Sequence, residues 1–137
     1  MIKAVVDTNV LISGFIWGGT PKKIIDKFRF ERSFLLVFSP ELIHEFRGKL
    51  LHKFHLRPEL VNQWVEELSL YTELVIPELT AKICRDPKDN MILDTAKSTS
   101  ANYIVTGDKD LLSLRTFSTI TIVSPKEFLV ILTRNGI

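Results

Sequence analysis

The sequence is poor in cysteine and contains no long apolar run. Cys84 is the single cysteine among 137 residues, so the chain can form neither an internal disulfide nor a zinc site built from several of its own cysteines. No apolar run approaches the roughly 18 residues that a membrane-spanning helix needs. The first residues reach Asp7 after five apolar positions and one lysine, which is unlike a secretory signal peptide. We therefore expect a cytoplasmic protein that does not enter a membrane.

Net charge is also small, but the charges are unevenly distributed. The chain carries 18 Lys and Arg against 16 Asp and Glu, whereas residues 22–57 hold nine basic and four acidic side chains. Five of the seven aspartates fall within residues 86–110. A basic segment suits a polyanionic substrate, and a group of aspartates suits a cation. The alternative is that the basic segment only forms solvated helix faces, and composition alone favours that alternative.

Five short apolar runs, rich in Val, Ile and Phe, predict β-strands. They cover residues 2–6, 34–38, 74–76, 103–106 and 120–123. Because these runs are almost continuously apolar, we expect a sheet covered on both faces. Helix starts are predicted at Thr20-Pro21, Ser39-Pro40, Asp86-Pro87 and Ser124-Pro125, and an amphipathic helix at about residues 58–71. Strands and helices that alternate in this way predict an α/β domain with a parallel sheet, and the length suits one domain over residues 1–137.

Three aspartates from distant parts of the chain are expected at the same edge of this sheet. Asp7 ends the first predicted strand, and Asp108 follows the fourth. Asp89 lies in the first turn of a predicted helix, on the same face as Ile92 and Leu93. Open parallel sheets bind ligands beyond the carboxyl ends of their strands. Each aspartate alone is equally explained as a turn or cap residue, but together they favour a divalent metal site, because grouped carboxylates repel one another.

Glu45 is a weaker candidate on the residues alone. It lies at the margin of the apolar stripe of the helix predicted after Ser39-Pro40. The simplest interpretation is an i,i+4 ion pair with Lys49, worth a few tenths of a kcal/mol. Spacing and periodicity therefore leave Glu45 outside the predicted site.

Four segments carry acidic residues in a recognisable order and spacing. They are residues 5–10 (VVDTNV), 39–45 (SPELIHE), 89–96 (DNMILDTA) and 103–110 (YIVTGDKD). Together they resemble the PIN-domain ribonucleases, and in particular the VapC-like toxins of toxin–antitoxin pairs. The resemblance extends over essentially the whole chain. It implies a three-layer α/β/α fold with a mainly parallel central sheet of about five strands.

The resemblance also implies a function, namely endonucleolytic cleavage of RNA that depends on Mg²⁺ or Mn²⁺. The residues that match the catalytic and metal-binding positions of the family are Asp7, Glu45, Asp89 and Asp108. Glu45 thereby enters the expected site. A homodimer and an antitoxin protein are the implied partners. The alternative is a non-catalytic RNA- or protein-binding domain on the same fold.

Further polar residues beside these positions are candidates for a supporting role. Thr8, Asn9 and Thr106 are expected either to steady the carboxylates by hydrogen bonds or to form strand-end turns. Asp86 and Asp110 are expected at most to assist from outside the ligand set.

The chain departs from the commonest toxin pattern in two respects. A charged segment, residues 85–88 (RDPK), precedes Asp89 in place of an apolar lead-in. Asp94 and Asp110 add two acids that the resemblance leaves without a clear role.

Overall fold

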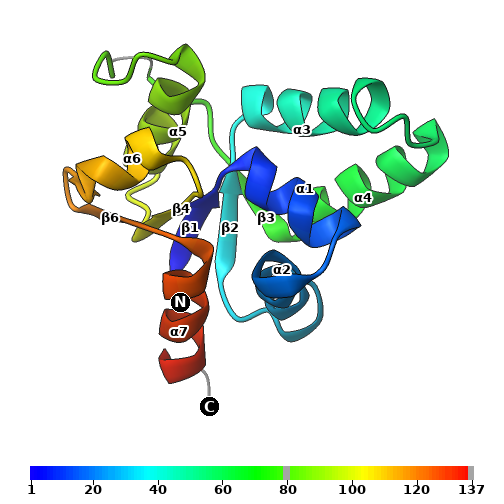
Figure 1. The fold of residues 1–137 in the computed structure, drawn as a ribbon, viewed down its shortest axis with the longest axis horizontal. Helices are drawn as coiled ribbons and strands as arrows, with labels where there is room; N and C mark the ends of the chain where they lie inside the picture. The colour runs from blue at the N-terminus through cyan, green and yellow to red at the C-terminus, as the bar shows by residue number, and fades with distance from the viewer. Residues whose placement is uncertain (79–80, 136–137) are drawn as a thin grey trace.

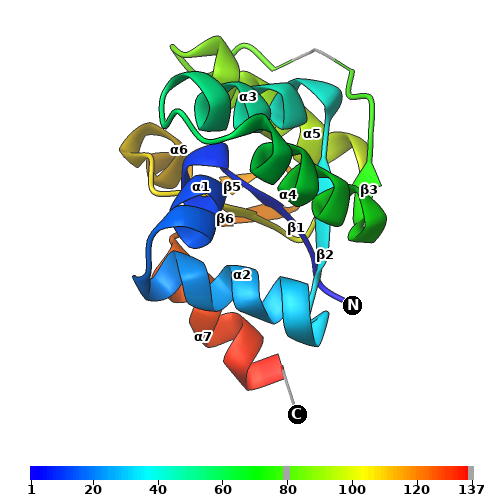
Figure 2. The same ribbon diagram turned by 90° about the vertical axis from the view of Figure 1, so that its right-hand side faces the viewer.

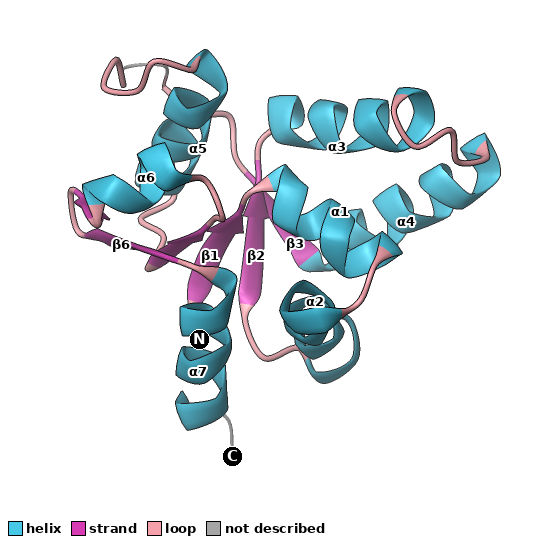
Figure 3. Cartoon of the chain, in the orientation of Figure 1, coloured by secondary structure: helices cyan, strands magenta, loops and turns pink. Residues whose placement is uncertain are grey.

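The centre of the fold is a six-stranded sheet, seen here in a computed structural model that describes residues 1–78 and 81–135 (Figures 1 and 3). The strands are β1 (Lys3–Val6), β2 (Leu35–Phe38), β3 (Thr72–Leu74), β4 (Tyr103–Val105), β5 (Thr116–Phe117) and β6 (Ile120–Val123). Their order across the sheet is β3-β2-β1-β4-β6-β5. Four of the pairings are parallel, and β5 pairs with β6 in antiparallel fashion. The prediction of an α/β fold with a mainly parallel sheet is confirmed.

Helices cover both faces of this sheet. The described residues form α1 (Thr8–Ile16), α2 (Gly19–Glu31), α3 (Pro40–His52), α4 (Pro58–Tyr71), α5 (Pro87–Ser98), α6 (Lys109–Leu114) and α7 (Pro125–Asn135). Helix α5 packs on β1, β2 and β4, whereas α7 packs on β6 and against α2. Figure 2 shows α2 and α7 on one side of the strands and α3 and α5 on the other. In the described part of the chain, no helix has the length and apolar character needed to cross a bilayer.

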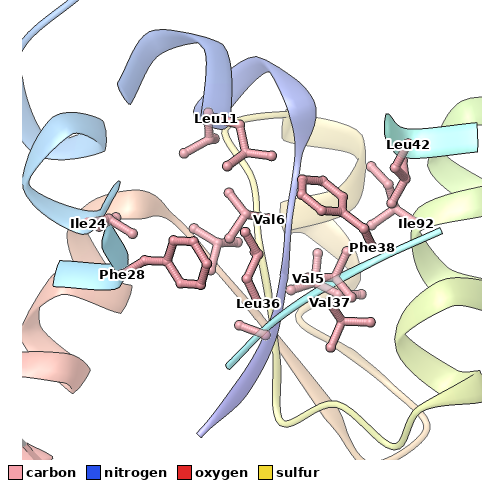
Figure 4. Packing of buried hydrophobic residues seen from close by; sticks show 14 of the residues in the cluster. Val5, Val6, Leu11, Ile24, Phe28, Leu36, Val37, Phe38, Leu42 and Ile92 are labelled. Carbon is pink, nitrogen blue, oxygen red and sulfur yellow. The ribbon is translucent and has the colours of Figure 1, made fainter. Parts of the chain in front are cut away.

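Alternating side chains of β1 and β2 build an apolar layer on each face of the sheet (Figure 4). Val6 and Leu36 face α2, where Phe28 packs, while Val5 and Val37 point to the opposite side. All four strand residues are fully buried. Burial on both faces is the reason that these strands are continuously apolar in sequence.

Helix starts largely follow the predicted capping residues. The Ser39 hydroxyl accepts a hydrogen bond from a backbone N–H in the first turn of α3, and the Asp86 carboxylate does the same for α5. Ser124 and Glu127 exchange two hydrogen bonds at the start of α7, which is the reciprocal arrangement of a capping box. These three predicted starts are confirmed, as is the amphipathic helix α4.

The helix start predicted at Thr20-Pro21 is wrong. Helix α2 begins two residues before Pro21, at Gly19, with Gly18 in the N-cap position. Gly19 has a φ of +76°, a conformation that glycine adopts without steric cost. The chain therefore turns at this glycine and enters the helix before Thr20 is reached. The preceding helix α1, which follows directly from β1, was not predicted.

The edges of the sheet also differ from the prediction. Strand β3 covers Thr72–Leu74 instead of residues 74–76 and pairs with β2 at the edge of the sheet. The side chains of Leu74 and Ile76 are 58% and 83% exposed, so the apolar run there does not mark burial. At the opposite edge, β5 adds a two-residue strand, which makes six strands where about five were predicted.

Candidate active site

The carboxyl ends of β1 and β4 form the base of the predicted site. The two strands are neighbours, with Val6 in register with Val105. Strand β1 has β2 on one side and β4 on the other. The strands that follow β1 in the chain are added first on the β2 side and later on the β4 side, so the strand order reverses between β1 and β4. Open α/β sheets bind their ligands at such a switch point. Asp7 and Thr106 directly follow the paired residues and therefore meet at this position.

Asp7 is held by hydrogen bonds on both carboxylate oxygens. Its Oδ1 accepts a bond of 3.2 Å from the backbone N–H of Asn9 as it caps α1. Its Oδ2 accepts a bond of 2.9 Å from the Thr106 hydroxyl, whose oxygen in turn accepts one of 3.0 Å from the Asp108 N–H. Asp7 and Thr106 are both buried. Thr106 thus fixes the position of Asp7 relative to the start of α6.

Asp108 lines a groove together with Asp7. As the N-cap of α6, its Oδ1 accepts bonds from the backbone N–H groups of Asp110 (2.7 Å) and Leu111 (3.4 Å). Asp108 is exposed, and this groove runs along α1 past Ser13. Two of the predicted carboxylates therefore face one solvent-accessible space.

Glu45 projects from α3 and is surrounded by donors. Its Oε1 lies 2.6 Å from the Thr8 hydroxyl, 3.0 Å from Lys49 Nζ and 2.9 Å from Lys88 Nζ. Burial raises the pKa of Glu45, but the hydrogen bonds from Lys88, Thr8 and Lys49 outweigh burial and hold that pKa below its ordinary value. The i,i+4 pair with Lys49 is present, and Glu45 also contacts the residues of the site.

Lys88 links Glu45 to Asp7. Its Nζ lies 3.9 Å from Asp7 Oδ1 in addition to its contact with Glu45. We refer to Asp7, Glu45, Asp89 and Asp108 as the acidic cluster. One ammonium group thus contacts two of its four members, which come from β1 and α3.

Asp89, the next residue of α5, is only 3% exposed. Within the described residues, no group donates a hydrogen bond to its carboxylate. Burial raises the pKa of Asp89 to about 6, with further contributions from the negative charges of Asp108, Asp86 and Asp7, while Lys88 acts in the opposite direction. Asp89 is therefore a buried carboxyl group that other members of the acidic cluster surround with like charge.

The other predicted residues lie around the acidic cluster. Asp86 caps α5, and Asp110 forms an exposed ion pair with Arg85 at 3.0 Å. Asn9 donates to Asp7 through its backbone N–H, and its side-chain oxygen accepts a hydrogen bond of 2.8 Å from Lys49 Nζ. Asp86 and Asp110 thus hold local structure at the border of the cluster.

Two residues of α5 anchor the segment that leads into the site. The Asn90 side chain both accepts from the backbone N–H of Cys84 (2.9 Å) and donates to its carbonyl (3.1 Å). The carboxylate of Asp94, which is buried, accepts from the backbone N–H of Ala81 at 2.9 Å. These bonds position the segment before Lys88 and Asp89, and they give Asp94 a structural role.

The sequence matches the PIN domain over residues 3–110. The match spans all four members of the acidic cluster. The chain belongs to the PIN domain family. The family inferred from the four acidic segments is thereby confirmed.

Two known proteins extend this comparison. The PIN domain described here is 38% identical over 120 residues to MJ1680, an uncharacterised protein of Methanocaldococcus jannaschii, and the match covers 83% of this chain and 76% of MJ1680. The crystal structure of PAE2754 from Pyrobaculum aerophilum is similar with a TM-score of 0.66 and 15% sequence identity, over 97% of this chain and 96% of PAE2754. The second likeness shows that the two proteins share a fold.

PIN domains are generally nucleases, and they typically use divalent metal ions. The acidic cluster of this PIN domain supplies carboxylate oxygens, which are the ligands that Mg²⁺ and Mn²⁺ prefer. No described residue donates a hydrogen bond to the Asp89 carboxylate, and a cation would offset its charge among the neighbouring carboxylates. In residues 1–78 and 81–135, no three acidic, histidine or cysteine side chains already surround a position for an ion. The donor chemistry of the acidic cluster therefore fits a divalent ion.

Sequence analysis missed Lys88 as a residue of this site. A signal was present, because Lys88 directly precedes Asp89 in the charged lead-in that departs from the toxin pattern. A basic residue in the first turn of a helix, directly before a candidate ligand, lies within reach of the same carboxylates.

Proposed function

We propose that this PIN domain is a metal-dependent endoribonuclease that hydrolyses RNA phosphodiester bonds. The observation that carries the proposal is the environment of Asp89, a 3% exposed carboxyl group with a pKa of about 6 beside Asp7 and Asp108. A buried carboxylate among like charges is stabilised by a divalent cation. Membership of a family whose members are generally nucleases supports phosphodiester hydrolysis as the reaction.

The proposed metal ligands are four carboxylates. Glu45 and Asp89 lie on α3 and α5, and Asp7 and Asp108 are the N-cap residues of α1 and α6. When bound, a divalent ion offsets charge on the phosphate and lowers the pKa of a water molecule. The hydroxyl groups of Thr106 and Thr8 hold Asp7 and Glu45, respectively, at 2.9 and 2.6 Å. Because the pKa of Glu45 is held below its ordinary value, this carboxylate stays ionised and accepts a hydrogen bond from the attacking water. Hydrolysis by water leaves a 5′-phosphate and a 3′-hydroxyl.

The proposal is tested by incubating the protein with a mixed RNA pool and Mg²⁺ or Mn²⁺, with and without EDTA. We expect cleavage that EDTA abolishes and that Asp7→Asn and Asp89→Asn each reduce by roughly 100-fold, because each removes a ligand charge. Asp26→Asn is the matched control, since Asp26 pairs with Lys22 on α2, outside the acidic cluster. Gel analysis of the cut RNA measures the rate, and a parallel single-stranded DNA pool tests the preference for RNA.

Two outcomes contradict the proposal. Products that end in a 2′,3′-cyclic phosphate would show attack by the RNA 2′-hydroxyl instead of water. RNA that is retained without cleavage, equally by wild type and Asp7→Asn, would favour a non-catalytic binding domain.

We further propose that the domain is the toxin of a toxin–antitoxin pair, that it forms a homodimer and that an antitoxin protein is its partner. The four segments that resemble VapC-like toxins support this role. An apolar surface supports the homodimer, because Phe30 on α2 and Leu70 on α4 are 71% and 70% exposed and border one hollow together with Tyr71.

A further inference from the structure

An ammonium group lies inside the acidic cluster. Lys88 Nζ is 2.9 Å from Glu45 Oε1 and 3.9 Å from Asp7 Oδ1. The Lys88 side chain is only 26% exposed, so bulk water shields these contacts weakly. They join α5, which carries Lys88, to α3 and to the end of β1. Lys88 is thus a counter-charge held between two carboxylates from other elements.

These contacts use carboxylates that the proposed metal ion also needs. A divalent ion placed among the same oxygens would lie within a few ångströms of the ammonium group, where two positive charges repel strongly. The two cations therefore compete for Asp7 and Glu45.

The second lysine beside Glu45 has a different position. Lys49 Nζ is 3.0 Å from Glu45 Oε1, but its other contact is the side-chain oxygen of Asn9 at 2.8 Å instead of a second carboxylate. Lys49 and the Thr8 hydroxyl keep Glu45 hydrogen-bonded when Lys88 moves away. Withdrawal of Lys88 therefore leaves Glu45 paired and frees the space between Glu45 and Asp7.

We propose that Lys88 is a built-in counter-cation, which binds Asp7 and Glu45 in the metal-free protein and has to leave before a divalent ion is held between them. This inference rests on the proposed function, because it takes the acidic cluster as the metal site. Its consequence is that Lys88 lowers the affinity for the ion and so sets the metal concentration at which the site is filled.

Substitutions that separate charge from side-chain length test this role. Lys88→Met removes the charge and keeps an unbranched chain, whereas Lys88→Arg keeps the charge. Lys22→Met is the matched control, because Lys22 forms an i,i+4 ion pair with Asp26 on the surface of α2. Isothermal titration of the full chain with MnCl₂, without RNA, measures the dissociation constants. We expect Lys88→Met to bind Mn²⁺ about tenfold tighter than wild type, and the other two variants within about threefold of it.

Thermal unfolding separates this role from a merely structural one. In EDTA, Lys88→Met should unfold at a lower temperature than wild type, because Asp7 and Glu45 lose their shared cation. Mn²⁺ should then raise the Tm of the variant by more than it raises that of wild type. If Lys88 only stabilised the fold, Lys88→Met would lower Tm without any gain in metal affinity.

The outcomes distinguish the inference from the proposed function. If wild type binds Mn²⁺ and Lys88→Met binds it equally or more weakly, the role of Lys88 is overturned and the metal site stands. If neither protein binds Mn²⁺, the acidic cluster is not a metal site, and both the inference and the proposed function are overturned.

Discussion

At the scale of single residues, Asp89 is the member of the acidic cluster whose pKa is raised by burial and by neighbouring negative charges. It shares a face of α5 with Ile92 and Leu93, which are fully buried. Burial, followed by the negative charge of Asp108, raises its pKa to about 6. A carboxyl group whose pKa is raised by folding binds its proton more tightly in the folded state. The stability that the protonated Asp89 carboxyl group contributes to the folded state is therefore fully present below about pH 4 and is lost as the pH rises through about 6.

Asp89→Asn should accordingly stabilise the metal-free protein at neutral pH. Asparagine does not ionise, and no described residue donates a hydrogen bond that the substitution would remove. We expect the free energy of unfolding in EDTA to rise by about 1 kcal/mol at about pH 7.5, a modest gain because the positive charge of Lys88 already offsets part of the repulsion. The gain should vanish below about pH 4, where the wild-type carboxyl group is protonated in both states.

Urea unfolding at the two pH values measures this difference. Asp26→Asn, on the surface of α2, serves as the control and should change stability little at either pH. A gain for Asp89→Asn that is equal at both pH values would show that charge on Asp89 is not its cause.

At the scale of elements, α1 and α2 approach each other closely at Gly14. A Cβ atom there would lie 2.3 Å from Ile25 Cγ1 and 2.8 Å from the Pro21 carbonyl oxygen, both inside van der Waals contact. Helix α1 begins at the cap that Asp7 provides. The close approach at Gly14 therefore also fixes the helix whose first residues border the acidic cluster.

Two glycine substitutions should have opposite effects for this reason. Gly14→Ala forces α1 and α2 apart and should lower the free energy of unfolding by about 1–3 kcal/mol. Gly48 lies within α3, and a Cβ atom there meets nothing within 4 Å. Gly48→Ala should raise the free energy of unfolding by about 0.5–1 kcal/mol, because alanine loses less backbone entropy in a helix.

Chemical denaturation of both variants beside wild type measures the two effects. A stable Gly14→Ala protein would contradict the close packing of the two helices. A destabilised Gly48→Ala protein would contradict the open surroundings of α3 at that position.

At the scale of the whole molecule, the ends of α2 and α4 carry an apolar surface beside paired charges. Phe30 and Leu70 are largely exposed there. Close by, the Arg32 guanidinium lies 3.4 Å from the centre of the Tyr71 ring, and Arg29 pairs with Glu67. Exposed apolar groups bordered by polar ones are typical of protein–protein contacts, which suits the proposed homodimer.

The homodimer predicts that charge on this surface separates the subunits. Light scattering after size exclusion should give the mass of a dimer for wild type and of a monomer for the double variant Phe30→Glu, Leu70→Glu, with an unchanged circular dichroism spectrum. Ile83→Glu is the control, since Ile83 is 57% exposed in the segment before α5, and it should remain dimeric. Wild type that runs as a monomer would contradict the proposal.

The sequence by itself determined the class of fold and the family. Strand positions follow from continuous apolar runs, and the caps at Ser39, Asp86 and Ser124 follow from local hydrogen bonding, because both signals depend on residues close together in the chain. The same local signals failed where burial was incomplete, as at the exposed edge strand β3, and where a glycine with positive φ moved the start of α2.

The tertiary structure alone decided how the acids are neutralised. Thr106 bonds to Asp7 because β1 and β4 are in register, although the two residues are 99 positions apart. Lys88 reaches Glu45 because the fold brings the first turn of α5 to α3, which no periodicity within either helix reveals. Contacts of this kind depend on the order of strands in the sheet, and this order is a property of the folded chain.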